Sequence, residues 1–147
     1  MLELLAPAGN LDAVIAAVQN GADAVYMGFG DGFNARRSAD NFTRESFAKA
    51  VRYCHIRGCK VYVTLNTLVG DREMDAAAAL AQQASDAGAD AILVQDLGLA
   101  RVLRAALPDI PLHASTQMSI HNLAGVEAAA EMGITRAVLA RELSLEQ

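Results

Sequence analysis

The feature that most constrains this chain is a short pattern that recurs four times. A glycine is followed by a run of aliphatic side chains in NGADAVYMG, RGCKVYVTLN, AGADAILVQD and MGITRAVLARE, which begin at residues 20, 57, 87 and 132. Each glycine fits the left-handed position just past a helix end, where a residue without Cβ meets no steric penalty. The repeat therefore predicts a helix before each glycine and a strand after it.

Helical periodicity precedes each of these glycines, at residues 10–20, 43–57, 72–87 and 122–132. Asn10 and Thr43 stand where their side chains can cap the first turn. A further helix is predicted at 97–107, ending near Pro108, and is followed by a strand at 112–118. With strands at 2–6 and 136–140, the order is five strand-helix units and a sixth strand.

Short apolar strands that alternate with helices predict a parallel sheet covered by right-handed crossovers. Either a six-stranded doubly wound sheet or an eight-fold barrel that stops early fits this order. The ending favours the barrel, because Ser144 and Gln147 have the spacing of a capping box for a helix that the chain does not complete. We expect an α/β fold, an incomplete TIM-type (βα) barrel with about six parallel strands and five helices. It would form a single domain over residues 1–147, truncated before its last units.

Composition narrows the class of protein. With 147 residues, 53% of them hydrophobic, the chain can bury one substantial core. Its net charge of -5 gives no broad attraction to phosphate backbones or anionic lipid, although a local basic patch stays open. No run approaches the roughly 20 apolar residues that cross a bilayer, and the first residues lack the basic leader of a signal peptide. We expect a cytoplasmic protein with no membrane partner.

Polar residues follow five of the six predicted strands, at the edge where ligands collect in parallel α/β folds. Strand alternation places polar side chains on a shared face: His113, Ser115 and Gln117 in the fifth strand, and Tyr62, Thr64 and Asn66 in the third. We predict that these side chains line a cavity mouth and that the aliphatic sets pack against the helices. A hydrogen-bonded core cluster is an equally open interpretation.

Candidate site residues are taken from these strand ends. The candidate catalytic residues are His113, Ser115, Gln117 and Asn66, and the candidate substrate-binding residues are Arg36, Arg37, Gln95, Asp96, Thr116, Arg141 and Glu142. A serine nucleophile needs a base within hydrogen-bond reach and a third group to orient that base. Asp96 could be that third group beside His113 and Ser115, but an N-cap for the following helix explains it more simply.

The segment after the second predicted strand contains Gly28, Gly30 and Gly32. Their spacing resembles a dinucleotide fingerprint, but the third glycine comes one residue early and no helix opens there, so we reject nucleotide binding. A long loop remains, in which Arg36 and Arg37 could hold an anionic substrate or could simply be solvated.

Cys54, His55 and Cys59 have the residue types of a metal site. Adjacent residues of a helix point in different directions, and Cys59 lies beyond the predicted helix end, so the spacing argues against zinc. We expect free structural thiols and no metal site.

Several blocks of the sequence carry a resemblance to a known family. They are ELLAPAGNLDA, GADAVYMG, FNAR with ADNF, KVYVTLNTL, ILVQDLG, LHASTQM and LARELSLE, spread in this order over residues 3–146. Together they resemble the start of peptidase family U32, the collagenase-like peptidases. The resemblance covers essentially the whole chain.

The resemblance implies an incomplete eight-fold barrel that is followed, in full-length members, by more sequence. The family is named for proteolysis, although its catalytic type is unassigned. Other members take part in hydroxylation of RNA bases, and relatives hydroxylate the ubiquinone ring with an iron–sulfur cluster. FNARRSADNF together with VQDLG is most similar to the RNA-hydroxylating branch.

We therefore expect the N-terminal part of an enzyme that hydroxylates a tRNA or rRNA base, with a collagenase-like protease and a ubiquinone-ring hydroxylation factor as alternatives. RNA would be the partner of the full-length protein, and this part alone would be inactive. The family's cysteine-rich signature is absent from this chain, so we expect no cofactor here and an iron–sulfur cluster in the missing C-terminal part. The unpaired edge strands of such a fragment predict self-association.

Overall fold

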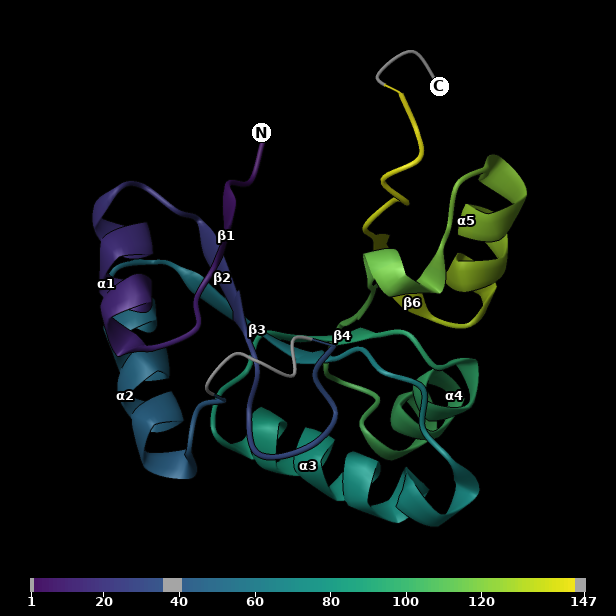
Figure 1. Ribbon diagram of the computed structural model, residues 1–147, viewed down its shortest axis with the longest axis horizontal. Helices are drawn as coiled ribbons and strands as arrows, with labels where there is room; N and C mark the ends of the chain where they lie inside the picture. The colour runs from purple at the N-terminus through teal and green to yellow at the C-terminus, as the bar shows by residue number, and fades with distance from the viewer. Residues whose placement is uncertain (1, 36–40, 145–147) are drawn as a thin grey trace.

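A computed structural model describes residues 2–35 and 41–144 and shows one open parallel sheet. Its strands are β1 (Leu5–Pro7), β2 (Ala24–Met27), β3 (Lys60–Leu65), β4 (Ala91–Val94), β5 (Leu112–Ala114) and β6 (Ile134–Ala137). Each strand pairs in parallel with the next one in the chain. The edge strands β1 and β6 face each other across the open side of the curved sheet (Figure 1). The predicted α/β fold with six parallel strands is confirmed, and the sheet is not closed.

Five α-helices lie along the outside of this sheet (Figure 1). They are α1 (Leu11–Gln19), α2 (Arg44–His55), α3 (Met74–Asp86), α4 (Leu97–Ala106) and α5 (Leu123–Glu131), and a 3₁₀ turn, η1 (Asp71–Glu73), leads into α3. Four of them begin at a side-chain cap, supplied by Asn10, Thr43, Asp96 and Asn122. Among the described residues, no helix is long and apolar enough to cross a membrane.

The glycines of the repeat occupy the predicted positions. Gly21, Gly58, Gly88 and Gly133 all have positive φ, between 71° and 98°. At Gly133 space is limited as well, because an added Cβ would lie 3.0 Å from the side chain of Arg104. The helix-ending role read from the sequence is therefore confirmed.

Three predicted strands have different bounds in the structure. The strand predicted at 112–118 ends at Ala114, because the Ser115 hydroxyl accepts the backbone N–H of Gln117 and starts a 3₁₀ turn, η2 (Thr116–Met118). The strand alternation assumed for residues 113, 115 and 117 therefore stops before Ser115. The strands predicted at 2–6 and 136–140 lie at Leu5–Pro7 and Ile134–Ala137, and the register between β5 and β6 shifts by one residue.

The two faces of the sheet bury different side chains. Val61 and Val63 of β3, and Ile92 of β4, point outward into two hydrophobic clusters shared with the helices. The inner face carries a separate cluster, which is Ala24, Tyr62, Ala91 and Leu93 with Leu5 and Tyr26. The prediction that the aliphatic sets meet the helices is confirmed for β3, with Val61, Val63 and Leu65, and for β5, with Leu112 and Ala114.

Candidate functional site

Asn66 and Ser115 connect the carboxyl ends of two strands that are not neighbours. Asn66 follows β3 and Ser115 follows β5, with β4 between them. The Asn66 amide Nδ2 donates a hydrogen bond to Ser115 Oγ at 3.1 Å, and its Oδ1 accepts the backbone N–H of Ala35 at 3.1 Å. Ala35 belongs to the loop after β2, so one amide side chain holds three segments together. The predicted convergence of Asn66 and Ser115 at this edge is confirmed.

A cavity of about 220 Å³, here called the inner cavity, opens at this edge of the sheet. Its lining combines apolar side chains of the inner face with polar groups from the strand ends: Leu5, Tyr26, Ala35, Thr64, Asn66, Leu93, Ser115, Thr116, Gln117, Val138 and Arg141. Drug-sized ligands occupy pockets of about 300–1,000 Å³, so this cavity suits a smaller group, such as a single ring.

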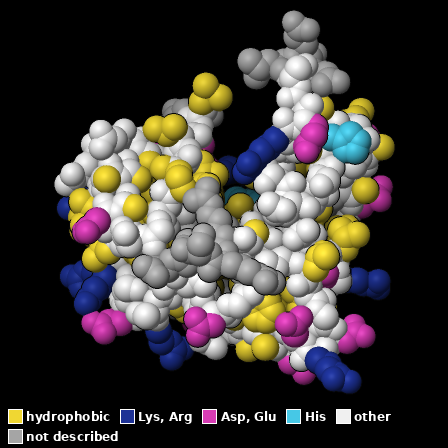
Figure 2. Space-filling model, in the orientation of Figure 1, with side chains coloured by type: hydrophobic (Ala, Val, Ile, Leu, Met, Phe, Trp, Pro, Cys, Tyr) yellow, Lys and Arg dark blue, Asp and Glu magenta, His cyan; other side chains and the backbone are white. Residues whose placement is uncertain are grey.

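A second space of about 200 Å³, here called the outer cavity, adjoins the first. Its lining residues are all polar or charged: Thr116, Gln117, Ser119, Arg141 and Glu142. Three of them, Thr116, Gln117 and Arg141, line both cavities. The space-filling view shows the molecule hollowed between its N-terminal strands and its C-terminal segment, with basic side chains at the margin (Figure 2).

His113 is buried and is not one of the residues that line either cavity. It is 6% exposed, and its ring meets the Tyr62 ring edge-on with centroids 4.9 Å apart. Burial, and then the positive charge of Arg136, lower the pKa of His113 to about 4, so the ring is neutral at pH 7. Within the described residues no hydrogen bond joins His113 to Ser115. The geometry therefore lacks the contact that a serine nucleophile requires, and a catalytic role for His113 stays a prediction.

A charged network closes the interior at the opposite, amino ends of the strands. The Glu3 carboxylate accepts hydrogen bonds from Arg136, from Tyr62 Oη at 2.9 Å and from Lys60 Nζ at 3.3 Å. The bond from Arg136 outweighs the opposing effect of burial and lowers the pKa of Glu3 to about 2. Burial and the bond to Glu3 raise the pKa of Tyr62 to about 12. No local pattern in the sequence relates residues so far apart in the chain, so this network could not be predicted from the sequence.

The remaining predicted residues fall into separate groups. Both carboxylate oxygens of Asp96 accept backbone N–H groups, from Leu99 at 2.8 Å and from Val69 at 3.4 Å, which supports the N-cap interpretation. Gln95 follows β4 and is half-buried. Arg36 and Arg37 lie outside the described residues.

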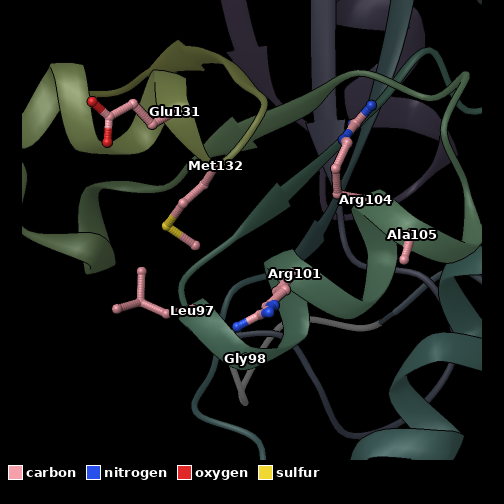
Figure 3. Close-up of a pocket in the computed structure, with 7 residues that line it drawn as sticks. All are labelled: Leu97, Gly98, Arg101, Arg104, Ala105, Glu131 and Met132. Atoms are coloured by element: carbon pink, nitrogen blue, oxygen red, sulfur yellow. The ribbon is translucent and has the colours of Figure 1, made fainter.

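A larger groove of about 660 Å³ lies between α4 and α5, on the outside of the sheet (Figure 3). The side chain of Met132, just past α5, points toward Leu97 at the start of α4, while Glu131 points away from α4 (Figure 3). Its charged lining residues do not converge on one point, because Glu131 points away and the Arg104 guanidinium donates to the backbone oxygens of Pro108 and Ile110. The strand-end cavities therefore remain the candidate functional site.

The described residues do not fit an iron–sulfur cluster or another bound metal. They contain no group of three or more His, Cys, Asp or Glu side chains that could hold a metal ion. Cys54 and Cys59 are buried free thiols against the helices, and burial, with the nearby Cys59, raises the pKa of Cys54 to about 12. The thiolate is the form that binds metals, so this environment disfavours ligation.

The fold and the strand-end cavities define an α/β protein of the (βα)-barrel type with its candidate site at the carboxyl edge of the sheet. The model of peptidase family U32 matches residues 9–147, and the chain belongs to that family.

Several characterised or solved proteins are similar to this chain. It is 42% identical to the 23S rRNA 5-hydroxycytidine C2501 synthase of Escherichia coli (strain K12), over 99% of this chain and 22% of that protein. It is 41% identical to tRNA hydroxylation protein P1 of Bacillus subtilis (strain 168), over 97% of this chain and 33% of that protein. A protein named collagenase from Porphyromonas gingivalis is 35% identical over 99% of this chain and 34% of its own length. The chain thus spans about a fifth to a third of the length of these relatives.

A solved structure of a U32 peptidase superposes with a TM-score of 0.76 at 16% identity, over 95% of this chain and 58% of that one. This likeness supports the fold.

Proposed function

We propose that the protein takes part in the hydroxylation of a base in rRNA or tRNA, in the cytoplasm, and that the inner cavity receives the base. The observation that carries the proposal is the joining of Asn66 and Ser115 above a small cavity at the carboxyl edge of the sheet. Two relatives at 42% and 41% identity are named for RNA hydroxylation. The whole protein would be the enzyme, and this chain would supply the part that holds the base.

The lining of the inner cavity suits a planar base. Enzymes that modify a base inside folded nucleic acid turn it out of its stack and into a snug pocket. Leu5, Leu93 and the ring of Tyr26 offer apolar surface for its faces. The side chains of Thr116 and Gln117 offer both donors and acceptors for its edge.

Hydroxylation of a base replaces C–H by C–OH and removes two electrons, so it needs an oxygen donor and an electron acceptor. Because the described residues do not fit a metal or cluster, we derive no step through such a group. The contribution assigned to this chain is to hold the base in a fixed orientation, which lowers the entropic part of the barrier.

The test is deletion of the gene for the whole protein, followed by mass spectrometry of nucleosides from its rRNA and tRNA. We expect a hydroxylated pyrimidine nucleoside to disappear and to return when the gene is restored. A gene carrying Asn66→Ala should restore about a tenth of the modification or less, because the amide that orders the cavity is gone. Asn20→Ala, which removes an exposed amide at the end of α1, is the matched control and should restore it fully. Unchanged nucleosides in the deletion strain would contradict the proposal.

Proteolysis is the second candidate, because one relative is named collagenase. It predicts that the purified whole protein cleaves gelatin and loses this activity in Ser115→Ala and His113→Ala variants. Ser115 Oγ already accepts hydrogen bonds from Asn66 and from the backbone of Gln117, so the geometry favours a structural role for it. Gelatin cleavage that depends on Ser115 would reverse this preference.

A further inference from the structure

We infer that the outer cavity binds the ribose and phosphate of the nucleotide whose base occupies the inner cavity, and that Glu142 selects ribose over deoxyribose. The inference rests on the proposed function and deepens it, because it names a specificity-determining residue. It assigns Arg141 to the phosphate and Glu142 to the 2′-hydroxyl group.

The two cavities lie side by side. They share Thr116, Gln117 and Arg141 in their linings, so one ligand can contact both through the same three side chains. A nucleotide also has two parts of different character, a flat base at one end and a polar sugar and phosphate at the other. The inner cavity has apolar walls from Leu5 and Leu93, while every residue lining the outer cavity is polar or charged.

Most polar side chains of the outer cavity are not used within the protein. Among the described residues, the side chains of Thr116, Gln117, Arg141 and Glu142 form no hydrogen bond or ion pair. Arg141 and Glu142 are adjacent in sequence and line the same space, yet they leave their donors and acceptors open to a ligand.

The outer cavity combines a positively charged side chain, Arg141, with a negatively charged one, Glu142. A guanidinium group presents a planar fork of N–H donors that matches phosphate oxygens. A carboxylate can only accept hydrogen bonds, so Glu142 requires a donor from the ligand, and it repels a second anion. A sulfate ion offers no such donor. A ribonucleotide offers both a phosphate for Arg141 and a 2′-hydroxyl group for Glu142, and the 2′-hydroxyl is what distinguishes RNA from DNA.

The wall of the outer cavity is preorganised. The η2 turn starts at the Ser115 hydroxyl, and Ser119 at its end has left-handed backbone angles, φ 56° and ψ 35°. The backbone N–H of Ser119 donates to Thr116 O at 3.0 Å, which closes the turn. Residues 116–119 therefore present their side chains from a hydrogen-bonded turn, and less ordering has to accompany ligand binding.

The test uses the whole protein and two fluorescein-labelled probes, a short single-stranded RNA of cytidine and uridine and its 2′-deoxy counterpart with deoxyuridine. Anisotropy should show that the wild type binds the RNA about tenfold or more tightly, since a hydrogen bond to a charged acceptor is lost with the deoxy probe. Glu142→Ala should bring the ratio of the two affinities close to one. Glu127→Ala, which removes an exposed carboxylate from α5, is the matched control and should keep the wild-type ratio.

Arg141→Ala should weaken the binding of both probes by a similar factor. It should also reduce the slope of log affinity against log salt concentration by about the contribution of one phosphate contact. Arg52→Ala, an exposed position of α2, is its control and should leave the slope unchanged. An unchanged ribose preference in Glu142→Ala, or no preference in the wild type, would overturn the inference.

The two proposals fail in different measurements. If deletion of the gene removes a hydroxylated nucleoside but Glu142→Ala keeps the wild-type ribose preference, the hydroxylation proposal stands and the ribose site is wrong. If the nucleosides are unchanged but the ribose preference depends on Glu142, the outer cavity is an RNA site and hydroxylation is wrong.

Discussion

Glu3, just before β1, and Arg136, in β6, form an ion pair that joins the first and last strands of the open sheet from the inside. The two residues are 133 positions apart, and their strands are not hydrogen-bonded neighbours. Tyr62 of β3 donates its hydroxyl to the same carboxylate, so the contact also reaches the middle of the sheet. The pair thus holds the curvature that brings the strand ends around a common interior.

Removing Arg136 should destabilise the fold. We expect Arg136→Met to lower the free energy of unfolding by about 1–2 kcal/mol, because Glu3 is left partly buried with weaker partners. Urea unfolding followed by circular dichroism measures this change. Arg52→Met removes an exposed arginine from α2 and should leave the midpoint unchanged. In the double variant Arg136→Met with Glu3→Gln, the loss of unfolding free energy should be smaller than the sum of the losses in the two single variants. Additive losses would contradict a direct coupling between the two residues.

Glu3 should also make stability depend on pH at the acid end. Its pKa is about 2 in the folded state against an ordinary value of 4.5, so the unfolded chain binds the proton first. The stabilisation is fully present above pH 4.5 and is lost as the pH falls toward 2. Between pH 5 and pH 2.5, the free energy of unfolding of wild type should fall by about 1–2 kcal/mol more than that of Glu3→Gln. This figure is discounted for the partial exposure of the pair. Glu127→Gln, at an exposed carboxylate of α5, should follow the wild-type curve.

The burial of His113 should make stability depend on pH in a second, higher pH range. Its pKa is about 4 when folded and 6.5 in the reference state, so the unfolded chain takes up the proton between these values and stability falls as the pH drops from 6.5 to 4. His113→Phe keeps an aromatic ring against Tyr62 and removes the titration. Denaturant unfolding at pH 7 and at pH 4 gives the free energy of unfolding at each pH. Between these two pH values, wild type should lose about 2–3 kcal/mol more of this free energy than the variant does. Parallel profiles would show that His113 is not buried as a neutral ring.

Asp96 should behave as a helix cap. Asp96→Ala removes the acceptor for the N–H of Leu99 and should lower the free energy of unfolding by about 1–2 kcal/mol. Asp96→Asn keeps a capping oxygen and should recover most of the stability. If Asp96→Asn keeps its stability but loses RNA hydroxylation in the whole protein, the substrate-binding role predicted from the sequence would be supported instead.

The chain of residues 1–147, produced by itself, should self-associate. Among the described residues β1 and β6 each pair on one side only, and Leu2 and Leu4 beside β1 are 98% and 56% exposed. Unpaired edges with apolar neighbours favour pairing with another chain. Sedimentation velocity should show species larger than 15.5 kDa that increase with concentration. A Leu4→Lys variant should reduce them, and a monomer at all concentrations would contradict the expectation.

Helices and their ends could be predicted because their signals are local. Asn10, Thr43 and Asp96 cap helices through bonds to N–H groups three residues ahead, and Gly88 and Gly133 end them through their own backbone angles. The fifth strand was predicted too long, because an apolar and polar alternation looks the same in a strand and in a strand followed by a 3₁₀ turn.

The candidate site could be predicted only in part. Asn66 and Ser115 follow strands of one parallel sheet, so their convergence follows from topology. The bond from Ala35 to Asn66 and the separation of His113 from Ser115 could not be read from the sequence, because they depend on how a loop folds back and where a strand ends.

The amino-acid sequence by itself determined the alternation of strands and helices, the side of the sheet that each aliphatic run covers and the edge where the polar residues gather, since all three follow from short-range periodicity and from parallel topology. Only the tertiary structure decided that Glu3 meets Arg136 and that the loop after β2 returns to bind Asn66. Those contacts depend on the curvature of the whole sheet, which sums small twists over six strands and has no signature in any local stretch of sequence.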